Sequence, residues 1–136
     1  MDDPGIYDLG DFSIAGAGTQ VGTVVTGLAG MLAASLQGRF VYGSGGTACK
    51  LYWQTSFDQG TTWLDVACMT FGTANETDLV NVSGLTPKTS VVTPTDGALA
   101  DDTVVDGLLG DRLRAKVVST GTYATSTTVS VRASVR

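Results

Sequence analysis

Apolar residues recur along the chain in short runs that alternate with polar residues, and glycine- and threonine-rich turns separate the runs. Alternation with a period of two is typical of a strand with one buried face, and no long stretch keeps the 3.6-residue period of an amphipathic helix. The predicted strands are residues 6–14, 20–26, 32–42, 48–56, 62–71, 79–82, 90–93, 112–119 and 127–135. Short strands at these intervals predict an all-β, single-domain antiparallel β-sandwich or jelly roll.

The alternation also predicts which side chains are buried. In residues 32–42 the predicted buried positions are Leu32, Ala34, Leu36 and Phe40. In residues 112–119 one face holds Leu113, Ala115 and Val117, and the other holds Arg112, Arg114 and Lys116. In the central hairpin, one face of the first strand holds Leu51 and Trp53, and one face of the second holds Leu64, Val66 and Cys68. A sheet with such an apolar face needs a second layer to cover it.

The chain has 136 residues, 43% of them apolar, which is enough for one folded domain without a metal ion or a disulfide. Residues 21–136 hold the predicted sandwich. Residues 1–20, MDDPGIYDLGDFSIAGAGTQ, have two open interpretations. They form either an N-terminal arm that pairs with the sheet edge of a neighbouring subunit, or the first strand of the chain's own sandwich.

The segment SFDQGTTW, residues 56–63, fits the pattern Ser-x-Asp-x-Gly-x-x-Trp and resembles the Asp-box, a hairpin motif common in sialidases and other secreted glycosidases. In this hairpin, which begins at Ser56, we expect the Asp58 carboxylate to accept hydrogen bonds from its own turn and Gly60 to adopt a positive φ. Trp63 is expected to fold its ring under the turn. These roles are structural, and a propeller enzyme needs several blades where this chain has one motif.

The charge of the chain argues against nucleic acid and membrane partners. Its eight Lys and Arg residues are scattered among 13 Asp and Glu residues, the net charge is −5, and no basic stripe for phosphates results. No apolar run reaches the roughly 18 residues of a membrane-spanning helix. The acidic start differs from a signal peptide, so we expect a protein that is made and folded in a cytoplasm. Only 15% of residues are charged, which suits a surface that packs against neighbours.

The absence of histidine from the sequence excludes Ser-His-Asp and Cys-His catalytic centres. Two carboxylates can serve glycoside hydrolysis, but the candidates fit turn, edge and loop positions. These candidates are Asp58, Asp65, Glu76 and Asp78. We therefore expect no enzyme activity and no cofactor.

The segment DGALADDTVVDGLLGD is rich in carboxylates that are hard oxygen ligands for calcium. The carboxylates belong to Asp96, Asp101, Asp102, Asp106 and Asp111. Their spacing does not match an EF-hand, and the favoured interpretation is a long surface connection with capped turns and a short helix through residues 104–109. Such a loop is also a predicted contact site for another subunit, through Asp96, Asp101, Asp102 and Asp106.

The two cysteines, Cys49 and Cys68, fall nearly opposite each other on the two strands of the hairpin. A disulfide between them is possible if their Cα atoms lie within about 4.4–6.8 Å of each other. In a reducing cytoplasm they are expected instead to stay buried thiols.

Three stretches together resemble small virion proteins encoded in the structural-gene modules of tailed phages and prophages of Gram-negative, especially alphaproteobacterial, hosts. They are TGLAGMLAASLQGRFVYGSGGT, LYWQTSFDQGTTWLDVACMTF and GDRLRAKVVSTGTYATSTTVSVRASVR. The resemblance extends from about Val21 to the end of the chain and is most specific in the hairpin with Asp58, Gly60 and Trp63. No catalytic residue is implied by it.

The resemblance implies a virion structural protein, first of all a head decoration or cement protein on the outer surface of the capsid. Its partners would be the major capsid protein and other copies of itself, in a trimer or another cyclic oligomer. A tail or head-tail connector component is the alternative location. A carbohydrate-binding or host-adhesion module is the alternative function, and it predicts exposed rings among Tyr42, Tyr52, Trp53 and Tyr123.

Overall fold

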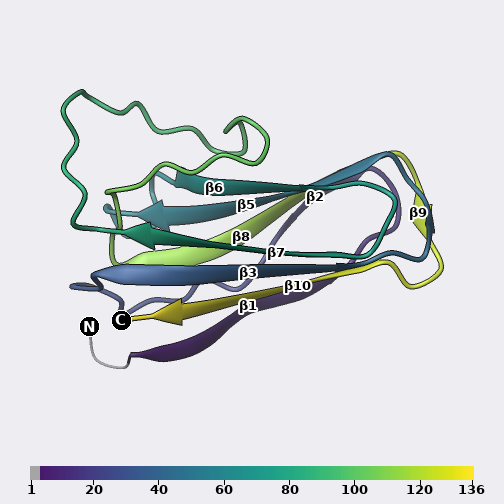
Figure 1. The fold of residues 1–136 in the computed structure, drawn as a ribbon, viewed down its shortest axis with the longest axis horizontal. Coiled ribbons are helices and arrows are strands. Elements are labelled where there is room, and N and C mark those ends of the chain that lie inside the picture. Colours follow the sequence, from purple (N-terminus) through teal and green to yellow (C-terminus); the bar gives the residue numbers. More distant parts are fainter. Residues whose placement is uncertain (1–3) are drawn as a thin grey trace.

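Two four-stranded antiparallel sheets pack face to face in the computed structural model, which describes residues 4–136 (Figure 1). The strands are β1 (Gly5–Ser13), β2 (Gly18–Val21), β3 (Ala33–Val41), β4 (Ser44–Gly45), β5 (Ala48–Ser56), β6 (Leu64–Phe71), β7 (Glu76–Ser83), β8 (Arg112–Thr120), β9 (Tyr123–Ala124) and β10 (Thr128–Val135). The first sheet has the order β1-β10-β3-β7 and the second has the order β2-β8-β5-β6. The short strands β4 and β9 pair with each other at one end of the molecule (Figure 1). The predicted all-β sandwich is confirmed.

The strand order is that of a jelly roll. With β4 and β9 set aside, the first strand pairs with the last, β2 pairs with β8, β3 pairs with β7, and β5 and β6 form the central hairpin. This nested pairing brings together segments from opposite ends of the chain, because Gly5 lies opposite Val135. Eight strands in two sheets with such long-range pairing are typical of jelly rolls.

The core lies between the sheets and is filled by the inward positions of the alternating strands. Ala34, Leu36 and Phe40 are buried as predicted, and the predicted apolar face of residues 112–119 is also buried. At Gly38 the sheets approach closely, since a Cβ atom built there would lie 2.7 Å from Leu51 Cδ2 and 2.9 Å from Met69 Sδ. A side chain at this position would therefore displace the ends of the Leu51 and Met69 side chains, and glycine avoids this.

The N-terminal segment joins the first sheet of its own chain. β1 pairs with β10 along its length, with a bulge between Asp8 and Gly10, and its side chains Leu9 and Phe12 enter the core. Within residues 4–20, the structure thus has the first-strand arrangement of the two that the sequence allowed. Residues 1–3 of the predicted arm lie outside the described residues.

Four predictions about the elements were wrong. Residues 22–24 of the predicted strand 20–26 form no strand, because β2 ends at Val21. Leu32 is 54% exposed, because the strand begins only at Ala33 and the Leu32 backbone N–H donates instead to the Arg136 carbonyl. Residues 90–93, which lie between Pro87 and Pro94, form no strand. Residues 104–109 form no helix, since the Val105 N–H donates to a carbonyl of β6 and Gly107 has a φ of 101°.

A bulge in the hairpin overturns the predicted face of Cys68. Trp53 lies opposite Ala67 but Gln54 lies opposite Asp65, so that Val66 is an extra residue in β6. An extra residue reverses the inward and outward alternation beyond it. Unbroken alternation predicted that Cys68 faces the core together with Leu64 and Val66. In the structure Cys68 points away from the core.

Candidate functional site

The hairpin motif has the predicted local geometry. The Thr62 backbone N–H donates to Asp58 Oδ1 at 2.7 Å, and the Ser56 hydroxyl donates to the same oxygen at 3.0 Å. These hydrogen bonds, that from the Thr62 N–H first, lower the pKa of Asp58. Gly60 has a φ of 89° and lies over the buried ring of Trp63. The carboxylate is occupied by its own turn, so its role in the structure is to hold the turn.

Replacing Gly60 with alanine is expected to lower the free energy of unfolding by about 1 kcal/mol, because an L-residue is strained at a φ of 89°. Steric overlap adds little, since the new Cβ would lie 3.5 Å from the Trp63 ring. Urea unfolding measures the change. The control is Gly72→Ala, because a Cβ there has no neighbour within 4 Å. An equal loss in both variants would contradict the role of the backbone angle.

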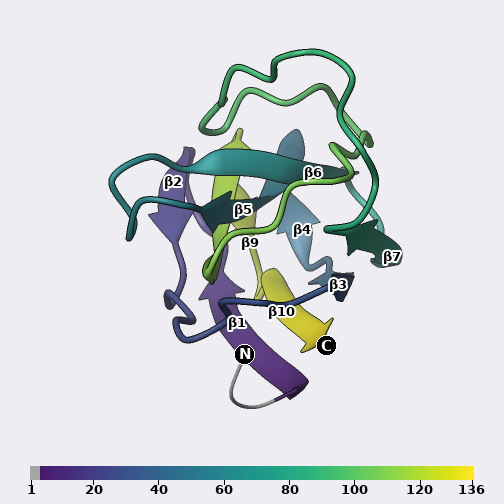
Figure 2. The same ribbon diagram turned by 90° about the vertical axis from the view of Figure 1, so that its left-hand side faces the viewer.

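The loop of residues 84–111, called here the covering loop, lies over the outer face of β6 and β5 (Figure 2). It is attached to β6 by backbone hydrogen bonds from the Cys68 N–H to the Thr103 carbonyl and from the Val105 N–H to the Val66 carbonyl. This third layer buries Tyr52 and Cys68, which point outward from the second sheet. The predicted long surface connection is therefore an ordered part of the body of the protein.

Asp65 is the residue that holds the covering loop most extensively. Its side chain is fully buried and accepts hydrogen bonds from Gln54 Nε2, Thr95 Oγ1 and the consecutive backbone N–H groups of residues 97–99. Consecutive N–H groups that converge on one carboxylate form an anion-binding nest. Asp65 was predicted to lie at a turn, edge or loop position. The sequence signal for its burial is a charged residue between the apolar residues Leu64 and Val66.

A line of polar contacts continues from Asp65 across the second sheet. Gln54 Nε2 also donates to Asp96 at 2.6 Å, and Arg114 Nε donates to Gln54 Oε1 at 2.7 Å. The Arg114 guanidinium carbon lies 4.1 Å from the centre of the Trp63 ring, a cation–π contact. The network links the hairpin motif to the covering loop and leaves none of its charged groups unpaired.

The four carboxylates predicted to contact another subunit all bind groups of their own chain. Asp96 pairs with Lys116 at 2.9 Å, and Asp101 pairs with Lys50 at 2.7 Å. Asp102 accepts from the Thr70 N–H at 2.9 Å, and Asp106 accepts from the Ser83 N–H at 2.6 Å. Each therefore ties the covering loop to a strand, and contact with another subunit stays a prediction. Within residues 4–136 no three Asp, Glu or Cys side chains lie close enough together to hold a metal ion.

The two cysteines are free thiols in the structure. Cys49 lies opposite Phe71 and Cys68 lies opposite Tyr52, so the two side chains are on opposite faces of the sheet. Burial raises the pKa of Cys49 to about 12 and also raises the pKa of Cys68. Both groups stay protonated at neutral pH, and the expected buried thiols are confirmed.

The aromatic rings that a carbohydrate-binding module would expose are mostly buried. Tyr52, Trp53 and Tyr123 have at most 5% exposure, and Tyr42 is half-buried. Tyr123 packs edge-on against Phe40 and donates its hydroxyl to the Gly72 carbonyl. These rings hold the sheets together and form no open platform.

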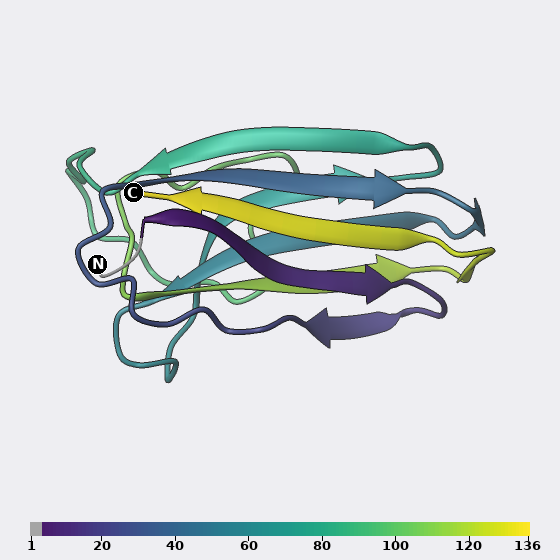
Figure 3. The same ribbon diagram turned by 90° about the horizontal axis from the view of Figure 1, so that it is seen from below.

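No other part of residues 4–136 covers the outer face of the first sheet (Figure 3). Cross-strand rows of mostly polar side chains follow from the register. One row is Leu79-Gln37-Arg132-Asp8, the next is Thr77-Arg39-Ser130-Asp11, and the third is Asn81-Ser35-Ser134-Ile6. Arg132 pairs with Asp8 at 2.8 Å and with Asp11 at 3.3 Å, which fixes the charged side chains at one end of two rows.

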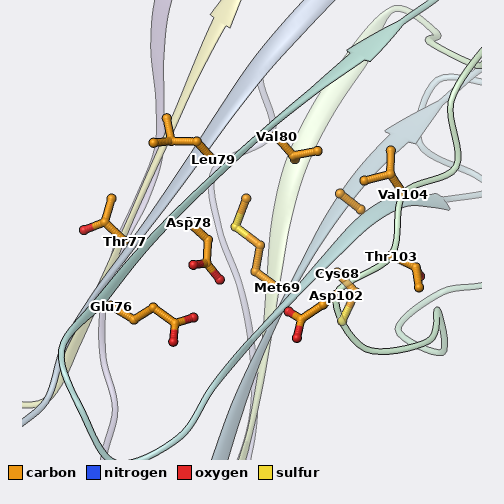
Figure 4. Close-up of a pocket in the computed structure, with 11 residues that line it drawn as sticks. Cys68, Met69, Glu76, Thr77, Asp78, Leu79, Val80, Asp102, Thr103 and Val104 are labelled. Carbon is orange, nitrogen blue, oxygen red and sulfur yellow. The ribbon is translucent and has the colours of Figure 1, made fainter.

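A groove of about 720 Å³ runs beside β7, between this strand, β6 and the covering loop (Figure 4). Three carboxylates line it, those of Glu76, Asp78 and Asp102, together with the apolar side chains of Met69 and Val80. Figure 4 shows the three carboxylates directed toward the space between β7 and the loop. A hydrogen bond with Asp78, burial and the negative charges of Asp78 and Asp102 raise the pKa of Glu76 to about 7.

Because its pKa is raised above the ordinary value of 4.5, Glu76 holds its proton more tightly in the folded chain than in the unfolded one. Its stabilising contribution is complete below about pH 4.5 and is lost as the pH rises to about 7. In Glu76→Gln this loss should disappear, and the variant should be more stable than the parent chain above pH 7, by less than about 1 kcal/mol at this exposed site. Urea unfolding across this pH range tests the prediction, and parallel curves for the two proteins would contradict it.

Comparisons of the chain with family models, with curated proteins and with solved structures found no match. No helix in residues 4–136 has the length and apolar character that crossing a membrane requires. The class that the structure defines is an antiparallel jelly roll with one sheet covered by its own loop.

Proposed function

We propose that this chain is a virion structural protein of a tailed phage, and that it decorates the outside of the head by bridging major capsid protein subunits. The jelly roll supports this proposal by analogy of fold, because jelly rolls recur in viral capsid proteins, although also in lectins and cupins. The resemblance of three stretches of the sequence to small virion proteins also supports a virion role. The net charge of the chain, −5, suits a position away from packaged DNA.

The observation that carries the proposal is the difference between the two sheets. Residues 84–111 cover the outer face of β6 and β5 in the second sheet, whereas no part of residues 4–136 covers the outer face of the first sheet, called here the bare face. On the bare face, Ser35, Ser130 and Ser134 are short side chains, and Ile6 and Leu79 are 77% and 70% exposed. An exposed sheet face of this kind suits docking on a shell whose subunits themselves stay in place.

Many copies acting together explain how a small domain would stabilise a capsid. Each copy needs only a modest interface, because binding to several subunits at once raises the overall affinity. A closed cyclic oligomer, most simply a trimer on a threefold axis, would present several such faces to the shell. A tail or connector position is the alternative location for the same type of contact.

Purified particles of the phage or prophage that encodes the chain provide the test. We expect the protein to copurify with intact heads, to dissociate on heating before the shell breaks, and to appear on the outer surface in a particle reconstruction. Ser35→Arg, on the bare face, should reduce its incorporation, whereas Thr73→Arg, in the exposed β6–β7 turn, should not. Absence from particles, or equal incorporation of both variants, would overturn the proposal, and density on the tail would replace the head assignment.

A further inference from the structure

The free edge of β7 has backbone groups that pair with nothing in the described part of the chain. The Ser83 N–H and carbonyl bond to the covering loop, away from β3, while the Gly84 N–H donates to the Leu32 carbonyl on the β3 side. Alternation along an antiparallel strand then places the N–H and carbonyl groups of Thr77, Leu79 and Asn81 on the side away from β3. Such a row of unpaired donors and acceptors is a template for another strand.

The other edge beside the groove is already filled. β6 pairs with residues 103–105 of the covering loop through backbone hydrogen bonds and a bridge between Ala67 and Val104. Along Glu76–Asn81 the covering loop does not pair with β7. The groove lies between them (Figure 4). The groove therefore offers an extended segment a position next to β7.

We infer that the free edge of β7 binds an extended segment of a partner protein that carries lysine or arginine at alternate positions. The segment would add a strand to the first sheet by pairing with Thr77, Leu79 and Asn81. This inference does not rest on the partner being a capsid subunit. The segment would bind the edge of the first sheet at β7, whereas the proposed capsid contact is made by the outer face of that sheet.

Charge determines the chemistry of the segment. Glu76, Asp78 and Asp102 line the groove, and none of its lining residues is a lysine or an arginine. Glu76 and Asp78 lie on one side of β7, so the side chains of an added strand that point the same way would meet carboxylates. Opposite charges on neighbouring strands attract and like charges repel.

The same charges argue against a second copy of β7 as the occupant. Pairing of two copies around a twofold axis at Thr77 would place Glu76 of each copy opposite Asp78 of the other, carboxylate against carboxylate. No lysine or arginine lines the groove, so the chain itself places no positive charge beside these carboxylates there. A basic segment from a different chain removes this repulsion.

A peptide of about nine residues in which lysine and threonine alternate is the probe, and the same peptide with glutamate in place of lysine is its control. Fluorescence anisotropy should detect binding of the lysine peptide, weaker at high salt, and no comparable binding of the glutamate peptide. Amide NMR shifts on the unmodified protein should locate the peptide at residues 76–81. Shifts confined to other strands, equal binding of both peptides, or no binding of the lysine peptide at about 1 mM would overturn the inference.

Leu79→Pro isolates the contribution of the strand edge. It removes an N–H that points away from β3 and adds a ring where the new strand would lie, and proline is tolerated on an edge strand in that orientation. We expect affinity for the lysine peptide to fall at least about tenfold, while Leu79→Ala, which keeps the N–H, changes it less than about threefold. Equal affinity of the two folded variants would contradict strand addition.

Discussion

Replacement of Asp65 with alanine should lower the free energy of unfolding by about 3–5 kcal/mol, because several buried donors lose their acceptor at once. The variant leaves the backbone N–H groups of Gly97, Ala98 and Leu99 without their acceptor, together with Gln54 and Thr95. Each buried donor left without a partner costs about 1–3 kcal/mol unless water reaches it. Such a loss is a large part of the total stability of a domain, about 5–15 kcal/mol.

Urea unfolding measures the total loss, and hydrogen exchange locates it. Exchange should become faster at residues 95–105 first, because Asp65 holds the covering loop, while the first sheet keeps its protection. Asp65→Asn is the isosteric comparison, and it should lose nearly as much, since one carboxylate oxygen becomes an N–H donor that faces other donors.

Asp8→Ala is the control for removing a carboxylate. Asp8 is exposed and pairs with Arg132 on the surface, so its loss should change stability by less than about 1 kcal/mol. If Asp65→Ala and Asp8→Ala were equally stable, Asp65 would not anchor the loop.

The sequence could predict the features that depend on residues close together in the chain. The alternation in β3 and β8 predicted their buried faces, and the motif from Ser56 to Trp63 predicted its own turn, because the bonds of that turn join residues within four positions of each other. The jelly-roll topology was only one of two predicted arrangements. Its decisive pairing joins β1 to β10 across almost the whole chain, and no local pattern records such a pairing.

The wrong predictions result from contacts between residues that are far apart in the sequence. Asp65 was assigned to a turn, edge or loop position, because the residues that bind it, 95–99, lie 30 and more positions along the chain. Cys68 was assigned to the core face because alternation gives no sign of the extra residue at Val66. Residues 104–109 have an apolar spacing compatible with a helix, yet the Val105 N–H donates to the Val66 carbonyl of β6, which extends this backbone along the sheet edge. In each case a tertiary contact decided against the local preference.

Trp53→Ala should cost about 3–5 kcal/mol of unfolding free energy, because it removes the largest fully buried side chain and leaves a cavity between the sheets. The cross-strand neighbours of Trp53 are Ala67 on one side and Ala115 on the other, which are too small to fill that space. Trp53→Phe should lose less than half as much, since it keeps most of the ring and gives up only a contact from Nε1 to Met69 Sδ at 3.4 Å.

Trp53→Ala also separates two functions. On a carbohydrate-binding platform, removing an aromatic side chain abolishes binding with little effect on stability, as is usual for exposed positions, where changes stay within about 0.5 kcal/mol. If Trp53 belongs to the core, as its burial indicates, the substitution lowers the free energy of unfolding instead. Leu79→Ala is the exposed control for urea unfolding, and a Trp53→Ala variant as stable as this control would show that the indole is not part of the core.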